Sequence, residues 1–239
     1  MPIQAIEPRR LYRQIADQLR ALIKAGEYAV GSRLPAERDL AAQLGVSRPS
    51  VREALIALEV EGLVEVRVGS GIHVIARDSA KPPLEAGAFG PFEIIRARQV
   101  VEGELAALAA TRMDNELVAG LNEAVALMED EIRRGITPIR GDRLYHLRIA
   151  EAADNGPLLR TVTELFDERN SPLFEQLGQH FENRESWGRA VAEHRAVIAA
   201  IAAQDPLAAR AAMQTHLKNS HDRFADNWPP GEALGAPSR

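Results

Sequence analysis

Four residues in the second half of the chain combine metal-binding side chains with a spacing that lets them converge. Asp142 and His146 are four residues apart, so in a helix both side chains lie on one face. His194 and His216 each fall on the apolar stripe of a later helical segment. A buried carboxylate is costly unless it is paired or bound to a metal. The pattern predicts a divalent metal site formed by Asp142, His146, His194 and His216.

The same four residues leave other interpretations open. Each histidine could be a core residue that hydrogen-bonds to the backbone. Imidazole suits zinc, the ion we expect, and nickel, and the carboxylate extends the range towards manganese. One Asp and three His with an open position also resemble the centre of a metal hydrolase or oxygenase, but no good general base lies beside them, so we do not expect an enzyme. A purely structural metal in a dimerising domain is a third alternative.

Two more polar residues lie on apolar helical stripes. Arg98 needs an anionic partner there, which is either Glu102, four residues on, or the carboxylate of a ligand. Asn170 is expected to face the same interior. The apolar residues on the two stripes are Ile94, Val101 and Leu105 for Arg98, and Phe166, Leu173 and Leu177 for Asn170.

A second group of reactive side chains opens a helix in the stretch GVSRPSVREAL, residues 45–55. Arg48 and Arg52 share one face at the start of this helix, where the backbone dipole favours negative charge. DNA could supply that charge, because arginine pairs with guanine O6 and N7 and a helix N-terminus suits a phosphate. Alternatively, the two arginines are solvated surface residues, or Arg52 pairs with Glu37 or Glu53.

The elements around these arginines predict a winged helix-turn-helix. Helices are expected over 9–25, over 36–44 and from the N-cap Ser47 to Gly62. The segments LVEVRV and GIHVI, separated by Gly69–Ser70–Gly71, form a hairpin. Arg38, early in the second helix, would reach a phosphate or a base beside Arg48 and Arg52.

The rest of the chain has only helical periodicity, so the fold class is mainly α: a winged helix-turn-helix followed by an all-α bundle. The expected domains are 1–76 for DNA binding, 77–90 as a linker, 91–226 as the bundle and 227–239 as a flexible tail. Pro172 should kink or split the fourth helix of the bundle. The bundle helices are expected over 92–112, 114–134, 138–154, 157–180, 185–203 and 206–226.

Composition is that of a globular protein and supports a division of labour. Of 239 residues, 46% are apolar and 26% charged. Residues 1–77 hold 11 basic and 9 acidic residues, a net charge of +2. Residues 78–239 hold 18 basic and 25 acidic residues, a net charge of −7. The chain lacks cysteine, an apolar signal-peptide core and a long apolar run. We therefore expect a cytoplasmic protein with no membrane partner.

Residues 9–75 resemble the DNA-binding domain of the GntR family of bacterial transcription regulators. The resemblance lies in Leu34–Pro35–Ala36–Glu37–Arg38, Gly45–Val46–Ser47–Arg48, Val51–Arg52–Glu53–Ala54–Leu55 and Gly62–Leu63. Pro49 departs from it, because many relatives carry a small polar residue there. The resemblance implies that double-stranded DNA is contacted by Arg38, Ser47, Arg48, Ser50, Arg52 and Gly69.

Residues 91–226 resemble the FCD effector domain of the FadR subfamily. The resemblance lies in Arg98–Gln99–Val100–Val101–Glu102, Gly141–Asp142–Arg143–Leu144–Tyr145–His146, Glu193–His194–Arg195 and His216–Leu217. It implies that Asp142, His146, His194 and His216 hold the metal, and that a small organic acid binds beside it with its carboxylate on Arg98. From its place on an apolar stripe, we expect Asn170 to help hold the acid.

The whole chain looks most like regulators of hexuronate and other sugar-acid catabolism, although lactate and aromatic-acid sensors share the same frame. The resemblance implies a homodimeric repressor that reads a pseudo-palindromic operator. The acid would release it from DNA.

Overall fold

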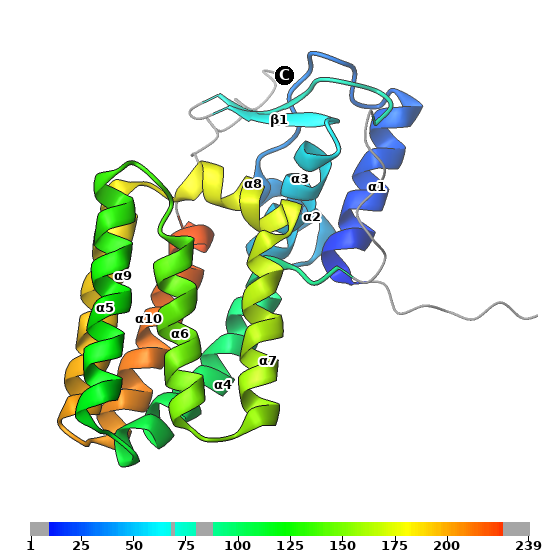
Figure 1. The fold of residues 1–239 in the computed structure, drawn as a ribbon. Coiled ribbons are helices and arrows are strands. Elements are labelled where there is room, and N and C mark those ends of the chain that lie inside the picture. Colours follow the sequence, from blue (N-terminus) through cyan, green and yellow to red (C-terminus); the bar gives the residue numbers. More distant parts are fainter. Residues whose placement is uncertain (1–9, 68–69, 80–87, 227–239) are drawn as a thin grey trace, which may run out of the picture. The chain divides into compact units, whose positions relative to one another are not determined.

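The computed structural model describes residues 10–67, 70–79 and 88–226 of the chain. These form two compact units, the first ending at Gly90 and the second spanning Pro91–Asp226 (Figure 1). The expected fold class is confirmed, because a helical unit with a small hairpin precedes an all-helical one. The expected tail 227–239, the expected DNA contact Gly69 and residues 80–87 of the expected linker lie outside the described residues.

The first unit has the element order of a winged helix-turn-helix. Its strands pair antiparallel, with Val64 opposite Val74 and Arg67 opposite Gly71. The elements are α1 (Leu11–Ala25), α2 (Glu37–Leu44), α3 (Arg48–Val60), β1 (Val64–Arg67) and β2 (Gly71–Val74).

The turn between α2 and α3 is set by local chemistry. Gly45 ends α2 with a φ of +66°, a left-handed conformation that favours glycine. Ser47 then caps α3, because its side chain accepts a hydrogen bond from the Ser50 amide, and Pro49 lies in the first turn, where a missing N–H does no harm. The short turn therefore brings the exposed start of α3 beside the start of α2.

A core shared by α1, α3 and the hairpin holds α3 in place. Arg20 of α1 makes a two-pronged ion pair with Glu61 at the end of α3, at 2.7 and 2.8 Å. The buried apolar side chains include Ile15, Leu19, Ile23, Val51, Leu55, Leu58, Leu63, Ile72 and Val74.

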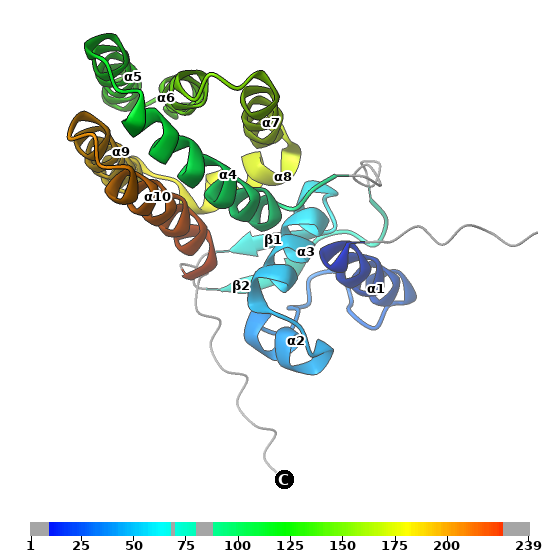
Figure 2. The same ribbon diagram turned by 90° about the horizontal axis from the view of Figure 1, so that it is seen from below.

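The second unit is a helical bundle arranged around α4. This helix contacts α6, α7, α9 and α10, and the view along the bundle shows these helices around it (Figure 2). The elements are α4 (Pro91–Thr111), α5 (Asn115–Arg133), α6 (Ile139–Ala152), α7 (Gly156–Asp167), η1 (Glu168–Asn170), α8 (Pro172–Phe181), α9 (Arg184–Ala202) and α10 (Pro206–Asp226).

Two features of the sequence shape this bundle near the expected metal ligands. Gly141 lets α6 pack closely on α5, since a Cβ atom there would lie 2.6 Å from the Met128 backbone nitrogen. The expected break at Pro172 is confirmed: the segment forms α7, the 3-10 turn η1 and α8 rather than one helix. Among the described residues, no helix combines the length and apolar character needed to cross a membrane.

Candidate metal centre and nucleic-acid interface

The structure brings the four expected metal ligands together inside the second unit. Asp142 and His146 come from α6, His194 from α9 and His216 from α10, and all four are buried. One ligand atom from each lies within 4.8 Å of the others. The i, i+4 spacing on α6 and the inward stripes of α9 and α10 produce this convergence, as expected from helical periodicity.

The facing atoms form an acceptor-rich centre. His194 Nε2 lies 3.1 Å from Asp142 Oδ1, and His146 Nε2 lies 3.5 Å from the same oxygen. The two Nε2 atoms are 3.4 Å apart. When both rings are neutral with their protons on Nδ1, two lone pairs and a carboxylate oxygen face one another, an arrangement that a cation stabilises.

Two carboxylates behind the rings orient them towards that centre. The Glu102 carboxylate contacts His146 Nδ1, and Glu193 Oε2 lies 2.9 Å from His216 Nδ1. A carboxylate at Nδ1 holds a proton there and leaves Nε2 for a metal, which is the usual support for a histidine ligand. Tyr145 fixes the third ring, because its hydroxyl donates to the His194 carbonyl at 3.0 Å and its ring packs edge-on against that imidazole.

The electrostatics of the centre also suit a cation. Burial raises the pKa of Asp142, but hydrogen bonds from His146 and His194 outweigh it and hold that pKa well below its usual range. Burial and the neighbouring His194 lower the pKa of His216 to about 3. The pKa of His194 is also lowered, chiefly by burial. These groups are therefore in their metal-binding protonation states at neutral pH.

His146 is the exception among the ligands. Burial lowers its pKa, but the Glu102 carboxylate more than offsets this, and the net pKa is raised. Burial likewise raises the pKa of Glu102, whereas Arg98 and His146 bring it down to about 2. The raised pKa of His146 shows that the two neighbouring carboxylates favour positive charge at this position. A divalent ion fits the same requirement, so the residues present fit a metal.

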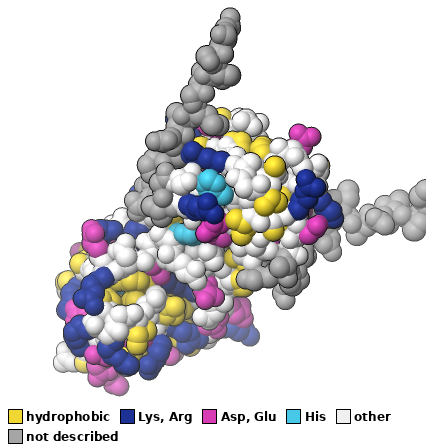
Figure 3. All heavy atoms as spheres, turned by 90° about the horizontal axis from the view of Figure 1, so that it is seen from above, with side chains coloured by type: hydrophobic (Ala, Val, Ile, Leu, Met, Phe, Trp, Pro, Cys, Tyr) yellow, Lys and Arg dark blue, Asp and Glu magenta, His cyan; other side chains and the backbone are white. Residues whose placement is uncertain are grey.

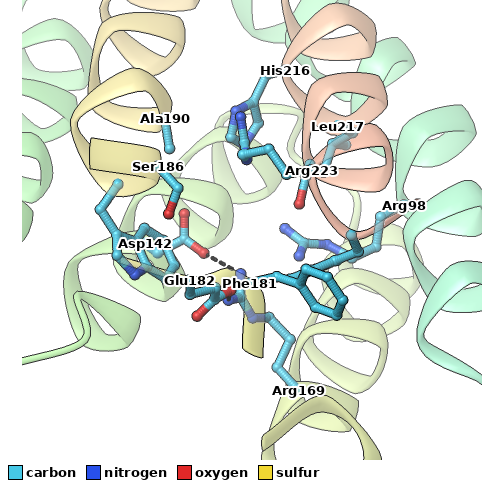
Figure 4. A pocket seen from close by; sticks show the side chains of 13 residues that line it. Arg98, Asp142, Arg169, Phe181, Glu182, Ser186, Ala190, His216, Leu217 and Arg223 are labelled. Atoms are coloured by element: carbon cyan, nitrogen blue, oxygen red, sulfur yellow. Dashed lines mark hydrogen bonds and ion pairs between the residues drawn. The ribbon is translucent and has the colours of Figure 1, made fainter. Parts of the chain in front are cut away.

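Arg98 lies at this centre with the nearer of its two expected partners. It is buried, and its Nε lies 2.6 Å from Glu102 Oε1. Its guanidinium carbon lies 4.7 Å from the centre of the Phe166 ring. Arg98 also lines the pocket next to Asp142 and His216, so the same guanidinium faces the space that a ligand would use (Figure 4).

The expected position of Asn170 is wrong. Asn170 is exposed in the 3-10 turn η1 and lines a separate hollow, with Thr137 and Phe174, rather than the pocket of Arg98. The expectation assumed one continuous helix through Phe166 and Leu173. Helix α7 instead ends at Asp167, and the 3-10 turn before Pro172 changes the angle between successive side chains.

The preceding residue, Arg169, takes the inward place. Its Nη1 lies 2.8 Å from Asp142 Oδ2, and its Nη2 lies 3.1 Å from Glu182 Oε1 (Figure 4). Burial raises the pKa of Glu182 despite this arginine. No periodic signal in the sequence marks Arg169, since its orientation depends on the irregular turn.

The pocket beside the four candidate ligands is polar and tight. Its central free space is about 20 Å³, room for about one water molecule. Arg223 was also missed from the sequence, although it lies seven residues after His216 on the same face of α10. The ionisable residues that line the pocket are Arg98, Arg169, Arg223, Asp142, Glu182 and His216.

In the first unit, the exposed start of α3 and the neighbouring start of α2 form a candidate nucleic-acid interface. Three quarters of the Arg38 side chain and about half of the Arg48 side chain are exposed. Ser47 and Ser50 lie beside Arg48, with their hydroxyls 2.8 Å apart. Figure 3 shows one face of the molecule, on which basic side chains lie beside a histidine.

In the free protein, Arg52 does not lie in a position from which its side chain could contact a base. Its side chain is fully buried, and it makes two hydrogen bonds to Glu37, Nε to Oε2 at 2.8 Å and Nη2 to Oε1 at 3.0 Å. The pairing with Glu37, one of the alternatives open from the sequence, is the contact present. The contact of Arg52 with DNA stays a prediction about the complex.

Comparison with known protein families divides the chain as its fold does. The family described as "Bacterial regulatory proteins, gntR family" matches residues 11–74. The FCD domain matches residues 93–219, more than half of the chain.

Three regulators from Escherichia coli (strain K12) are similar over nearly the whole chain. The "Exu regulon transcriptional regulator" is 38% identical over 229 residues, covering 91% of this chain and 86% of that protein. The "Uxu operon transcriptional regulator" is 35% identical over 233 residues, covering 93% and 90%. The "Putative L-lactate dehydrogenase operon regulatory protein" is 36% identical over 227 residues, covering 90% and 86%.

Proposed function

Because the chain belongs to the GntR family of bacterial regulatory proteins and carries an FCD domain behind its DNA-binding domain, we propose that it is a metal-containing repressor of sugar-acid catabolism. It regulates transcription and is not an enzyme, as the family and the three similar regulators establish. The repressor activity, the metal and the acid are our proposal. The protein would act in the cytoplasm, on chromosomal DNA.

The DNA-binding step would use two copies of the chain. A homodimer would place its two α3 helices in successive major grooves of a pseudo-palindromic operator. Support comes from the exposure of Arg38 and Arg48 and from the hydroxyls of Ser47 and Ser50 beside them. The arginines would contact bases or phosphates, and the serines would contact phosphates.

A divalent metal, most simply zinc, would be held by Asp142, His146, His194 and His216. When bound, the ion supplies a fixed positive charge and open coordination positions for an anionic ligand. The carboxylates behind His146 and His216 support this role, because such groups orient metal-binding imidazoles. The convergence of these four side chains is the observation that carries the proposal.

The effector would be a small hydroxylated carboxylic acid. Arginines and serines line the pocket and suit the oxygens of such an acid, and Phe181, Trp187 and Phe224 line it as well. The similarity to the Exu and Uxu regulators supports a sugar acid. Arg98 would hold the carboxylate. Because the free space is small and Arg98 already pairs with Glu102, the acid would have to displace that pair and open the pocket.

Lactate is the second candidate effector. One similar regulator carries a lactate-related name, and a three-carbon acid would require less opening of the tight pocket. Either acid would act by binding one arrangement of the dimer better than another, since only such a difference shifts the balance between them. The favoured arrangement would no longer fit the operator.

A thermal-shift assay of the zinc-loaded protein with galacturonate, gluconate and lactate would test the effector class. A ligand that binds the native state raises the melting temperature according to its occupancy. We expect galacturonate to raise it more than lactate at equal concentration, and the rise to vanish after chelation. No rise with any of these acids would exclude both candidates.

A further inference from the structure

Glu37 is a buried carboxylate at the centre of the candidate DNA-binding surface. It opens α2, and only 2% of its side chain is exposed. Arg52 of α3 approaches it as a fork, so that each carboxylate oxygen accepts one hydrogen bond from that guanidinium. A buried carboxylate requires such a partner, because burial without compensation is strongly unfavourable.

The same carboxylate also holds Arg48. Glu37 Oε1 accepts a hydrogen bond from Arg48 Nε at 2.8 Å, while about half of the Arg48 side chain remains exposed. Arg48 and Arg52 are one helical turn apart on α3, so a single acid on α2 reaches both. The hydrogen bond to Arg48 uses Nε, which lies at the base of the guanidinium, and does not occupy the terminal nitrogens.

We propose that Glu37 is a positioning residue for DNA recognition, which fixes the orientation of Arg48 before DNA binds, with Arg52 as its buried counter-ion. A free arginine loses side-chain entropy when it binds a base, whereas an arginine already held at Nε has lost part of it in advance. The held guanidinium can then present its terminal nitrogens to guanine O6 and N7.

This arrangement also gives Arg52 a role different from base reading. For Arg52 to reach a base, its bidentate ion pair with Glu37 would have to break. The buried carboxylate would then lose its main partner. The positive charge at the start of α3 has a local explanation as well, because Glu37 offsets it on the protein side. The inference depends on DNA binding by this domain and is independent of the metal and the effector.

Selection of preferred sites from a random duplex library would test the proposal, because the selection itself yields the operator sequence. We expect Glu37→Gln to bind the wild-type site about tenfold more weakly and to lose preference at one guanine in each half-site, within the discrimination that one bidentate contact provides. Arg48→Ala should lose preference at the same guanine. A purely structural role would weaken all positions equally, and an unchanged site preference in Glu37→Gln would overturn the proposal.

Two further variants guard against misfolding. Glu37→Met with Arg52→Met replaces the buried pair by apolar side chains, which are often tolerated, and should show the same single loss. Arg38→Ala with Arg48→Ala removes both exposed arginines and keeps both partners of the buried pair, Glu37 and Arg52. If a guanine preference persists in this second variant and is abolished when 7-deazaguanine replaces that base, the preference belongs to Arg52. That result would overturn the proposal.

Discussion

Glu193 Oε2 lies 2.9 Å from His216 Nδ1, so a carboxylate stands directly behind one of the candidate metal ligands. The same carboxylate accepts hydrogen bonds from Asn219 at 2.9 Å and from Arg223 at 2.9 and 3.2 Å. Three groups on α10 are thus tied to one residue of α9. The arrangement fixes the His216 ring, and it connects the metal site with an arginine of the adjoining pocket.

Replacing Glu193 by Gln should weaken metal binding. Loss of a carboxylate behind a histidine ligand typically lowers metal affinity by about 10–100-fold. Competition with a chromogenic chelator would measure this in purified protein. Glu185→Gln is the matched control, because Glu185 is an exposed residue of the same helix that pairs only with Arg189 among the contacts described. Equal zinc affinity in the two variants would remove Glu193 from the metal site.

Replacing Arg98 by Lys should impair the response to the acid and spare the metal. Lysine keeps the positive charge near Glu102 but lacks the planar fork that binds a carboxylate with two hydrogen bonds. Isothermal titration of the zinc-loaded variant with galacturonate should give at least about tenfold weaker binding, the effect of one lost charge-assisted hydrogen bond. Arg96→Lys, on an exposed position of the same helix, is the control. Wild-type affinity in Arg98→Lys would place the carboxylate elsewhere.

Replacing Arg48 by Ala should reduce operator binding. The loss should be about 1–3 kcal/mol if this exposed arginine reads a base, and preference should relax at that position alone. Fluorescence anisotropy with selected and scrambled duplexes separates the two effects. Arg140→Ala removes an exposed arginine of the second unit and should leave both affinities unchanged. A uniform loss on both duplexes would mean that Arg48 contacts only phosphate.

The metal-free protein should become less stable as the pH falls from 6.5 towards 3. In the unfolded chain His216 takes up a proton near pH 6.5, whereas in the folded protein its pKa is about 3. The unfolded state therefore binds the extra proton between these values, and each such proton changes stability by about 1.4 kcal/mol per pH unit.

The lowered pKa values of His194, Asp142 and Glu102 act in the same direction, the two carboxyls below their unfolded values near pH 4. The raised pKa of His146 opposes them. Urea unfolding at a series of pH values would check the slope, and His216→Gln should flatten it. A metal-free protein whose stability rises on acidification would contradict these shifts.

Sequence periodicity predicted most of the fold and the convergence of the four candidate metal ligands: helical spacing gave the helices, and alternation around a glycine turn gave the hairpin. Asp142 and His146 are placed by the pitch of one helix, and His194 and His216 lie on stripes whose inward direction follows from their apolar neighbours. Residues outside regular helix could not be placed in this way. Arg169 takes the inward place that was expected for Asn170, because η1 is a 3-10 turn, which periodicity does not reveal.

The burial of Arg52 shows a second limit. Its position on α3 predicts a face shared with Arg48, but whether it points to solvent depends on Glu37, which lies on another helix. Pairing between helices is a property of the folded chain. The size of the pocket could not be predicted from the sequence for the same reason. It depends on ion pairs between helices and turns, which Arg98 and Arg169 make with Glu102, Asp142 and Glu182.

The most direct test of the central claim is the affinity of the zinc-loaded protein for a selected operator duplex, measured with and without galacturonate, before and after chelation. We expect the acid to weaken operator binding at least tenfold, that is about 1.4 kcal/mol, only while the metal is bound, and His194→Ala to behave like the chelated protein. Equal weakening in the chelated protein, or no weakening by any sugar acid or by lactate, would contradict a metal-dependent sensor.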